Sequence, residues 1–227
     1  MVRIIFTLYI LFYGFTNFLY SQHKTGDHKI EKKLIDVGLV NIQEIDSTIK
    51  VDLRYSSLNN FLNADVYGDL SRCYLRKEAA LKLAQAQRYL KQKFPGHSLL
   101  IFDGARPRSV QYKMWEIFEG PDKQKYVANP QSGSIHNYGA AVDLTIVDDK
   151  GNLLDMGTEF DFFGKLAQPR YEEKFLKEGK LNEKQLSNRK LLREAMTKAG
   201  FQYIQSEWWH FNAFLKDVVK KKYSIIE

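Results

Sequence analysis

The sequence predicts an α+β fold in which a small antiparallel sheet is flanked by helices. Two long segments, 77–94 and 182–199, carry apolar residues at helical spacing, whereas four short segments have the composition of strands. Because helical and strand segments do not alternate regularly along the chain, a parallel sheet built from repeated strand–helix–strand units is disfavoured. A turn-rich stretch at 148–152 separates two apolar runs and predicts a hairpin.

Two strands and two helices are expected in the first half of the chain. Residues 49–55 alternate apolar and polar side chains, which is typical of a strand with one buried face. Residues 77–94 are rich in good helix formers, and a proline–glycine pair ends that helix. A short apolar strand is expected at 99–102, and Ser109 is placed to cap a helix that runs to about residue 118.

The second half is expected to contribute two more strands and the second long helix. Residues 141–147 have strand composition and lead into the predicted hairpin turn. The long helix begins at Asn182, and Gly200 stops it. Residues 201–205 alternate as a strand and run directly into Glu207-Trp208-Trp209-His210. One compact domain accommodates these elements in a chain of 227 residues.

Composition excludes several classes of site. Cys73 is the only cysteine, so neither an intramolecular disulfide nor a zinc site with several thiolates can form. The net charge is +7, but the lysines are scattered and cluster only at 220–222. No nucleic-acid-binding motif accompanies them, so we expect a solvated basic surface and no nucleic-acid partner.

Three residues predict metal chemistry. Asp143 is a carboxylate within an apolar strand, where it must be paired or metal-bound to offset its desolvation. His136 lies just ahead of that strand, and His210 lies in an aromatic stretch between Trp209 and Phe211. Two imidazoles and one carboxylate suit Zn²⁺, and three protein ligands leave a fourth position open for water. Each residue alone is more often a hydrogen-bonded core residue, so the prediction depends on their combination.

Glu207 stands three residues before His210. The two side chains share a face if the segment is helical but not if it is a regular strand. A strand that bends here would still allow His210 to bind zinc while Glu207 faces the water. Zinc lowers the pKa of its water, and a nearby carboxylate can accept the proton. We therefore expect Glu207 to be the general base.

Four sequence blocks, in the same order, resemble those of the zinc D-alanyl-D-alanine dipeptidases of the peptidase M15 group, the vancomycin-resistance-type dipeptidases. The blocks are Asp103-Gly104-Ala105-Arg106-Pro107, Ser134-x-His136-x-x-Gly139-x-Ala141-x-Asp143, Met156-Gly157-Thr158-Glu159-Phe160-Asp161 and Glu207-Trp208-Trp209-His210. The resemblance extends from about Val51 to Phe211. It implies a Hedgehog/DD-peptidase-like zinc fold with one Zn²⁺ per chain.

The resemblance also implies a role for each matched residue in the chemistry. His136, Asp143 and His210 fall on the family's zinc ligands, and Glu207 falls on its catalytic base. Arg106 falls on the arginine that stabilises the tetrahedral intermediate. This role suits a guanidinium, which offers fixed donors to a developing oxyanion.

Substrate contacts are implied for three further residues. Asp161 and Tyr55 match positions that hold the free ammonium of the dipeptide, and Ser134 lies where the family's pocket meets the substrate. The chain departs from the family pattern at Ile135, where a second serine is common, and at Ala105, where tyrosine is common. Both departures are expected to affect the shape of the pocket and hence the preferred dipeptide.

The implied activity is zinc-dependent hydrolysis of D-alanyl-D-alanine by a metal-activated water, with Glu207 as general base. One alternative is a zinc DD- or LD-carboxypeptidase that acts on peptidoglycan stem peptides, against which the ammonium-binding pair Asp161 and Tyr55 argues. The other is a non-catalytic, zinc-stabilised module that binds the cell envelope. The presence of Glu207 and Arg106 argues against it.

The first 22 residues have the composition of an export signal. Arg3 supplies one positive charge, residues 4–20 are almost uniformly apolar or aromatic, and the chain turns polar from His23. An uncleaved anchor is the alternative, because the apolar run approaches the ~20 residues that span a bilayer. We expect an exported, periplasmic protein that meets dipeptides from cell-wall metabolism and associates with the envelope only through its N-terminal segment. The predicted divisions are an export signal at 1–22, a lead-in at 23–48 and the zinc dipeptidase catalytic domain at 49–227.

Overall fold

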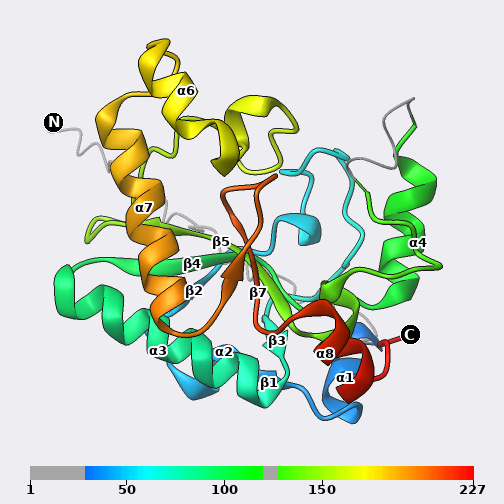
Figure 1. Ribbon diagram of the computed structural model, residues 1–227. Coiled ribbons are helices and arrows are strands. Elements are labelled where there is room, and N and C mark those ends of the chain that lie inside the picture. The colour runs from blue at the N-terminus through cyan, green and yellow to red at the C-terminus, as the bar shows by residue number, and fades with distance from the viewer. Residues whose placement is uncertain (1–28, 120–126) are drawn as a thin grey trace, which may run out of the picture.

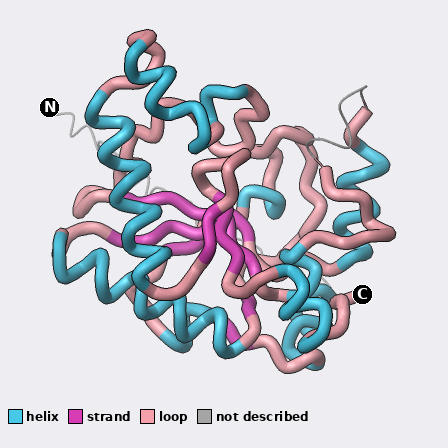
Figure 2. The backbone as a smooth tube through the Cα atoms, in the orientation of Figure 1, coloured by secondary structure: helices cyan, strands magenta, loops and turns pink. Residues whose placement is uncertain are grey.

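The computed structural model describes residues 29–119 and 127–227, and it has the predicted α+β composition. The main sheet has five strands in the order β2-β4-β5-β7-β6, which lie at the centre of the molecule with helices around them (Figures 1 and 2). The strands are β2 (Lys50–Val51), β4 (Ser98–Asp103), β5 (Ala141–Val147), β6 (Gln202–Tyr203) and β7 (His210–Asn212). A separate two-stranded sheet pairs β1 (Val40–Asn41) with β3 (Tyr74–Leu75).

The prediction of an antiparallel sheet is correct for three of the four strand pairs of the main sheet. The pairs β4–β5, β5–β7 and β6–β7 are antiparallel, but β2 pairs with β4 in parallel. A parallel neighbour requires a long crossover connection, and the segment between β2 and β4 provides one because it contains helix α3 (Lys77–Lys93). The edge strand β2 is therefore the one departure from the expected topology.

The helices lie around the sheet (Figure 1). Besides α3 they are α1 (Lys29–Asp36), α2 (Ile42–Ile45), α4 (Arg108–Ile117), α6 (Glu172–Lys177), α7 (Glu183–Lys198) and α8 (Lys216–Lys222). Four short 3₁₀ helices complete the described elements: η1 (Arg54–Ser56), η2 (Ile135–Tyr138), η3 (Lys165–Ala167) and η4 (Pro169–Tyr171). Helices α3 and α7 pack against each other, and α3 also packs on β4.

The two predicted long helices are confirmed, and their ends show why they form. The Asn182 side chain accepts a hydrogen bond from Gln185 N at 2.9 Å, and the Gln185 side chain accepts from Asn182 N at 3.0 Å. This reciprocal cap satisfies two donors at the start of α7. The predicted Ser109 cap of α4 is wrong: the cap position is Pro107, two residues earlier, and Arg108 N donates to Ile226 O at 2.7 Å.

Several short elements differ from the sequence expectation. The strand predicted at 49–55 pairs only at Lys50–Val51, because the chain then turns into η1. The strand predicted at 201–205 is likewise reduced to Gln202–Tyr203. The hairpin turn at 148–152 is confirmed, since Asp148 N donates to Asn152 O at 2.9 Å.

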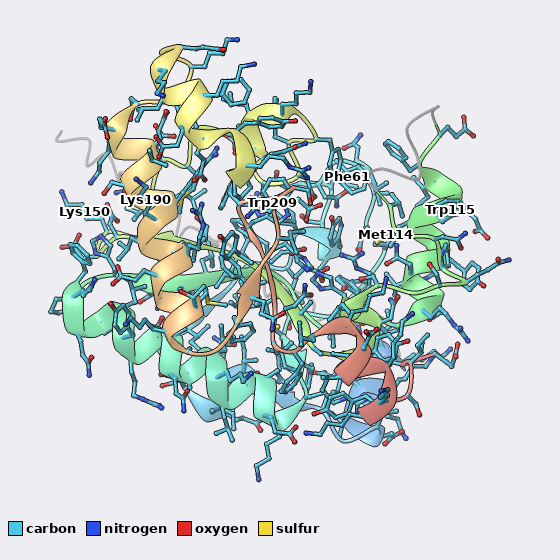
Figure 3. All side chains as sticks on the ribbon, viewed as in Figure 1. Phe61, Met114, Trp115, Lys150, Lys190 and Trp209 are labelled. Carbon is cyan, nitrogen blue, oxygen red and sulfur yellow. The ribbon has the colours of Figure 1, made fainter. Side chains whose placement is uncertain are left out.

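The lead-in contains structure that the sequence did not predict. Helix α1 and strand β1 lie within it, and Leu34 and Ile42 are fully buried in the same apolar core as Leu83 and Leu99. Trp209 also lies in this core, near the centre of the molecule (Figure 3). The proposed export signal at 1–22 lies outside the described residues, and the domain divisions stay predictions. Within the described ranges, no helix is both long enough and apolar enough to cross a membrane.

Candidate metal centre and active site

The two central strands β5 and β7 bring the predicted metal ligands together. Asp143 and His210 are register partners in this antiparallel pair. His136 lies on η2, which directly precedes β5. The Ser134 side chain caps η2 by accepting from His136 N at 3.1 Å, and Gly139 ends it with a φ of 70°, a conformation that favours glycine. Local capping therefore fixes where His136 points.

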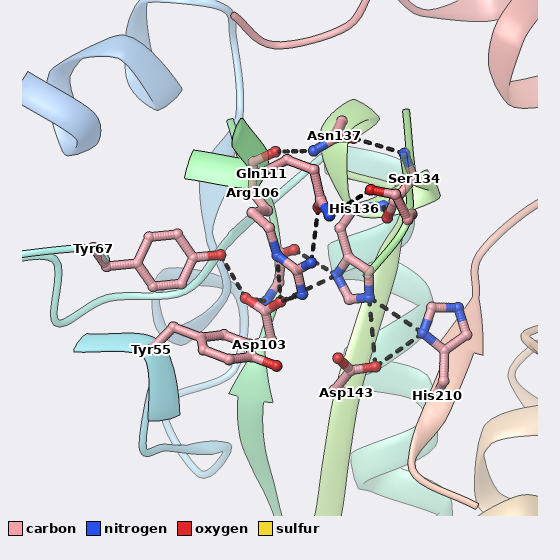
Figure 4. Close-up of polar contacts among 12 residues, drawn as sticks. Tyr55, Tyr67, Asp103, Arg106, Gln111, Ser134, His136, Asn137, Asp143 and His210 are labelled. Carbon is pink, nitrogen blue, oxygen red and sulfur yellow. Dashed lines mark hydrogen bonds and ion pairs between the residues drawn. The ribbon is translucent and has the colours of Figure 1, made fainter. Parts of the chain in front are cut away.

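Three ligand atoms converge on one point (Figure 4). Asp143 Oδ1 lies 2.9 Å from His210 Nδ1 and 3.4 Å from His136 Nε2, and the two nitrogens are 3.2 Å apart. Bonds of about 2.0–2.1 Å in a tetrahedral zinc site separate neighbouring ligand atoms by about 3.3 Å. The triangle therefore has the size that a metal ion of this kind requires.

The remaining nitrogen of each imidazole has its own partner. His136 Nδ1 donates to the carbonyl of Gly104 at 2.8 Å, and His210 Nε2 donates to Asn212 Oδ1 at 3.0 Å. Each contact places the ring proton on the outer nitrogen and leaves the inner lone pair toward the other ligands. Two imidazoles and a carboxylate in this arrangement fit a divalent cation.

The electrostatics of the cluster also favour a cation. Burial opposes ionisation of Asp143, but the two imidazoles outweigh it and hold the carboxyl pKa below its ordinary value. Burial lowers the pKa of His210, but Asp143 outweighs this effect and raises the pKa to about 9. The carboxylate is thus stabilised by positive charge, which either a proton or a metal ion can supply.

Glu207 belongs to the bent connection between β6 and β7, and His210 begins the regular part of β7. At Glu207 the segment is therefore neither a helix nor a regular strand. Glu207 lines the same pocket as His210, and burial raises the pKa of its carboxyl group above the ordinary value. A carboxylate with a raised pKa is a better proton acceptor at neutral pH.

Arg106 is held by two side chains that the sequence interpretation did not single out. Its Nε and Nη2 atoms donate to Asp103 Oδ2, and Nη1 donates to Gln111 Oε1 at 2.9 Å (Figure 4). Asp103 is fully buried, and its other oxygen accepts from Tyr67 Oη at 2.6 Å and from Gly104 N at 2.9 Å. These bonds leave one N–H on each terminal nitrogen of the guanidinium for a ligand.

Asp161 and Tyr55 form a second polar group in the pocket. Tyr55 Oη donates to Asp161 Oδ2 at 2.9 Å, although the residues are far apart in sequence. Burial raises the pKa of Asp161 well above its ordinary value. Asp161 has a φ of 60°, which is rare for residues other than glycine, so its conformation is maintained by its surroundings. A buried carboxylate of this kind gains most from a cationic partner.

One cavity of about 340 Å³ is lined by every site residue predicted from the sequence. These residues are Tyr55, Arg106, Ser134, His136, Asp143, Asp161, Glu207 and His210. Of the two departures from the family pattern, Ile135 also lines the cavity, whereas Ala105 is buried and does not line it. A larger hollow of about 990 Å³ shares Asp161 but contains none of the three metal ligands.

Three residues that hold predicted site residues in place were missed by the sequence interpretation: Asp103, Gln111 and Asn212. Asp103 had a signal, since it opens the block that contains Arg106. Asn212 had one too, because side chains two residues apart on a strand share a face. Gln111 had none, since it reaches Arg106 only through the packing of its helix. Lys216 also lines the cavity and was not singled out from the sequence.

Comparison with known proteins agrees with this geometry. The family model described as D-Ala-D-Ala dipeptidase, peptidase M15, matches residues 36–225. The D-alanyl-D-alanine dipeptidase of Escherichia coli K12 is 35% identical over 173 residues, which is 76% of this chain and 83% of the relative. That of Enterococcus faecalis V583 is 30% identical over 191 residues, covering 77% of this chain and 90% of the relative. That of Enterococcus faecium is 27% identical over 194 residues, covering 78% and 92%. The chain therefore belongs to the peptidase M15 family of metal-dependent D-Ala-D-Ala dipeptidases.

Proposed function

We propose that this protein is a zinc dipeptidase that hydrolyses D-alanyl-D-alanine. The observation that carries the proposal is the convergence of a metal-ligand triangle, a carboxylate base, a guanidinium and an ammonium-binding pair on one small cavity. A cavity of about 340 Å³ suits a small ligand. Each group also has the chemistry that one part of a free dipeptide requires.

His136, Asp143 and His210 would hold the zinc ion. Two neutral imidazoles and a carboxylate, with the imidazoles oriented by Gly104 and Asn212, are a common donor set for catalytic zinc. A bound zinc ion supplies Lewis acidity, which polarises a carbonyl and lowers the pKa of water. The fit of the donor set also favours a fold of the Hedgehog/DD-peptidase-like zinc class.

The remaining residues bind and orient the substrate and move protons. Asp161 and Tyr55 hold the ammonium group and so align the peptide bond within the cavity. Arg106 directs its free N–H groups at the carbonyl oxygen, where negative charge develops during attack. Glu207 accepts a proton from the attacking water and returns it to the leaving amine. Water is consumed, the C–N bond breaks, and two free amino acids leave.

A carboxypeptidase acting on longer stem peptides is the enzymatic alternative. Its substrates carry an acyl group where a free dipeptide has an ammonium, so Asp161 would face an uncharged chain. Burying that carboxylate without a cation is unfavourable. The hydrogen-bonded pair of Asp161 and Tyr55 therefore favours a free dipeptide over a longer stem peptide as the substrate. A non-catalytic envelope-binding module would have no use for the free N–H donors of Arg106 or for the base Glu207.

The test is hydrolysis by zinc-loaded protein of free and N-blocked D,D-, L,D- and L,L-peptides. We expect D-alanyl-D-alanine to be cleaved and its N-acetyl derivative to be resistant. Equal cleavage of both would favour a carboxypeptidase, and inactivity on all peptides would favour the binding module. Glu207→Gln should retain zinc but lower kcat about 10²–10⁴-fold, whereas the exposed Glu173→Gln on α6 should change neither.

We also propose that the protein is exported, as the composition of residues 1–22 supports. In that location its substrates would be dipeptides released from the cell wall, and its role would be recycling or nutrition. Mass measurement of the protein isolated from the periplasm tests this. Loss of a segment close to 22 residues supports a cleaved signal, whereas an intact chain in the membrane fraction supports an anchor.

A further inference from the structure

The polar groups assigned so far account for only one end of a dipeptide. A free dipeptide carries an ammonium at one end and a carboxylate at the other. Asp161 and Tyr55 suit the ammonium, and the metal ligands with Glu207 suit the peptide bond. The described lining of the cavity contains two cationic side chains besides the imidazoles, Arg106 and Lys216. A cation is the strongest partner for a carboxylate, so these two side chains are the candidates.

The charge of Arg106 is already compensated. Its guanidinium forms a buried ion pair with Asp103, and Gln111 accepts a further hydrogen bond from it. Its free N–H groups can donate to an oxygen, but the pair with Asp103 is close to neutral as a unit. A full negative charge at the rim of the cavity gains more from a cation without a counter-charge.

Lys216 is such a cation. It is exposed at the start of α8, and it forms no ion pair within residues 29–119 and 127–227. By contrast, Lys222 at the other end of the helix is paired with Glu78 at 2.7 Å. Val219 of α8 is fully buried and packs with Ile135 of η2, so the helix has a fixed place beside the segment that carries His136.

The strand order separates Lys216 from Tyr55, and the strand that carries Asp143 lies between them. Tyr55 follows the edge strand β2, whereas Lys216 follows β7. In the order β2-β4-β5-β7-β6, β4 and β5 lie between them, and β5 carries Asp143. Three strand spacings of about 4.8 Å separate these backbones by about 14 Å. Both side chains line the same cavity, so the distance between their polar ends can be shorter and can approach the roughly 7 Å span of an extended dipeptide.

We propose that Lys216 binds the C-terminal carboxylate of the substrate and thereby selects peptides that are free at both ends. The inference rests on the proposed dipeptidase function and adds the second half of its specificity. Asp161 rejects substrates without an N-terminal charge, and Lys216 disfavours those without a C-terminal charge. Because Lys216 is exposed, its attraction for the carboxylate weakens as salt is added.

The experiment compares D-alanyl-D-alanine with D-alanyl-D-alaninamide, which lacks the C-terminal charge. We expect Lys216→Met to lower kcat/KM for the dipeptide about tenfold, mainly through KM, and to leave the amide unchanged. Lys216→Arg should retain most of the activity on the dipeptide. The matched control is Lys220→Met, which removes an exposed lysine of the same helix that does not line the cavity. It should behave as the wild type.

A binding measurement separates this inference from the proposed function. Calorimetry on the zinc-loaded Glu207→Gln protein, with and without Lys216→Met, reports dipeptide affinity without turnover. About tenfold weaker binding in the double variant supports Lys216, even if the wild type proves inactive. Equal affinities, or an equal loss of kcat/KM for dipeptide and amide in Lys216→Met, would overturn the inference and leave the dipeptidase function intact. Absence of dipeptide binding would overturn both.

Discussion

Replacing Asp103 with asparagine should destabilise the protein and impair catalysis together. The Asp103 carboxylate uses both oxygens as acceptors: one receives Tyr67 Oη and Gly104 N, and the other receives Arg106. An asparagine amide offers one acceptor oxygen and one donor group. Whichever way the amide turns, its NH₂ group faces a donor. The substitution also leaves the buried Arg106 charge without a counter-charge.

The expected loss of stability in Asp103→Asn is large because the ion pair is buried. Asp103 is 0% exposed and Arg106 is 7% exposed, so water cannot replace the lost partner. Removing one member of a buried ion pair costs about 3–5 kcal/mol. That is a large part of the roughly 5–15 kcal/mol by which domains are stable. With a urea m-value of about 2–3 kcal/mol/M, the urea concentration at the unfolding midpoint should fall by about 1–2.5 M.

Urea unfolding and steady-state kinetics of Asp103→Asn measure the two consequences. kcat/KM for D-alanyl-D-alanine should fall about 10²-fold, because Arg106 loses the anchor that orients it. Tyr67→Phe is the matched control: it removes one hydrogen bond to the same carboxylate but keeps the ion pair. It should cost about 1.5–3 kcal/mol and leave most of the activity.

The reasoning would be refuted by an Asp103→Asn protein whose urea midpoint lies within about 0.3 M of the wild type. Such a result would mean that the Arg106 charge does not depend on Asp103. Normal kcat/KM despite a lowered midpoint would refute only the positioning of Arg106. A double-mutant cycle with Arg106→Met then gives the coupling between the two side chains directly.

Three further predictions concern the metal site and the stability of the fold. Asn212→Ala should weaken zinc binding about 10–100-fold in chelator competition, because the His210 ring loses the acceptor that orients it; unchanged affinity would contradict this role. Gly104→Ala should destabilise the protein by about 1–3 kcal/mol, since an added Cβ would lie 2.4 Å from Cys73 Sγ. Addition of Cys73→Ala should restore part of that loss in thermal unfolding, and no recovery would contradict the proposed clash. Glu78 accepts hydrogen bonds from two side chains at the C-terminal end of α8, which lower its pKa to about 2. Its contribution to stability is therefore complete above the unfolded-state pKa of about 4.5 and is lost as the pH falls toward 2. Glu78 is half exposed, so Glu78→Gln should cost at most about 1 kcal/mol at pH 7, and this difference from the wild type should shrink at pH 3.

Helices and strands with strong local sequence signals, such as a helix cap, could be predicted. Elements that depend on long-range packing could not. Helix α7 follows the sequence closely because Asn182 and Gln185 form its cap within a few residues. The parallel pairing of β2 was not predictable, since it depends on how α3 carries the chain across the sheet. Helix α1 is amphipathic, but it has only eight residues and a single fully buried one, Leu34, so its local signal is short. Its place in the core depends on long-range packing.

The sequence by itself determined the chemistry of this protein. The four blocks, together with Tyr55, contain the groups assigned to the proposed reaction, because residue types such as His, Asp, Glu and Arg are chosen for what their atoms can do. Only the tertiary structure decided how these groups act together. It made Asp143 and His210 partners across two strands, paired Tyr55 with Asp161, anchored Arg106 on Asp103 and brought Lys216 to the cavity. These relations join segments from different strands and helices, and distances between such segments depend on packing rather than on local sequence.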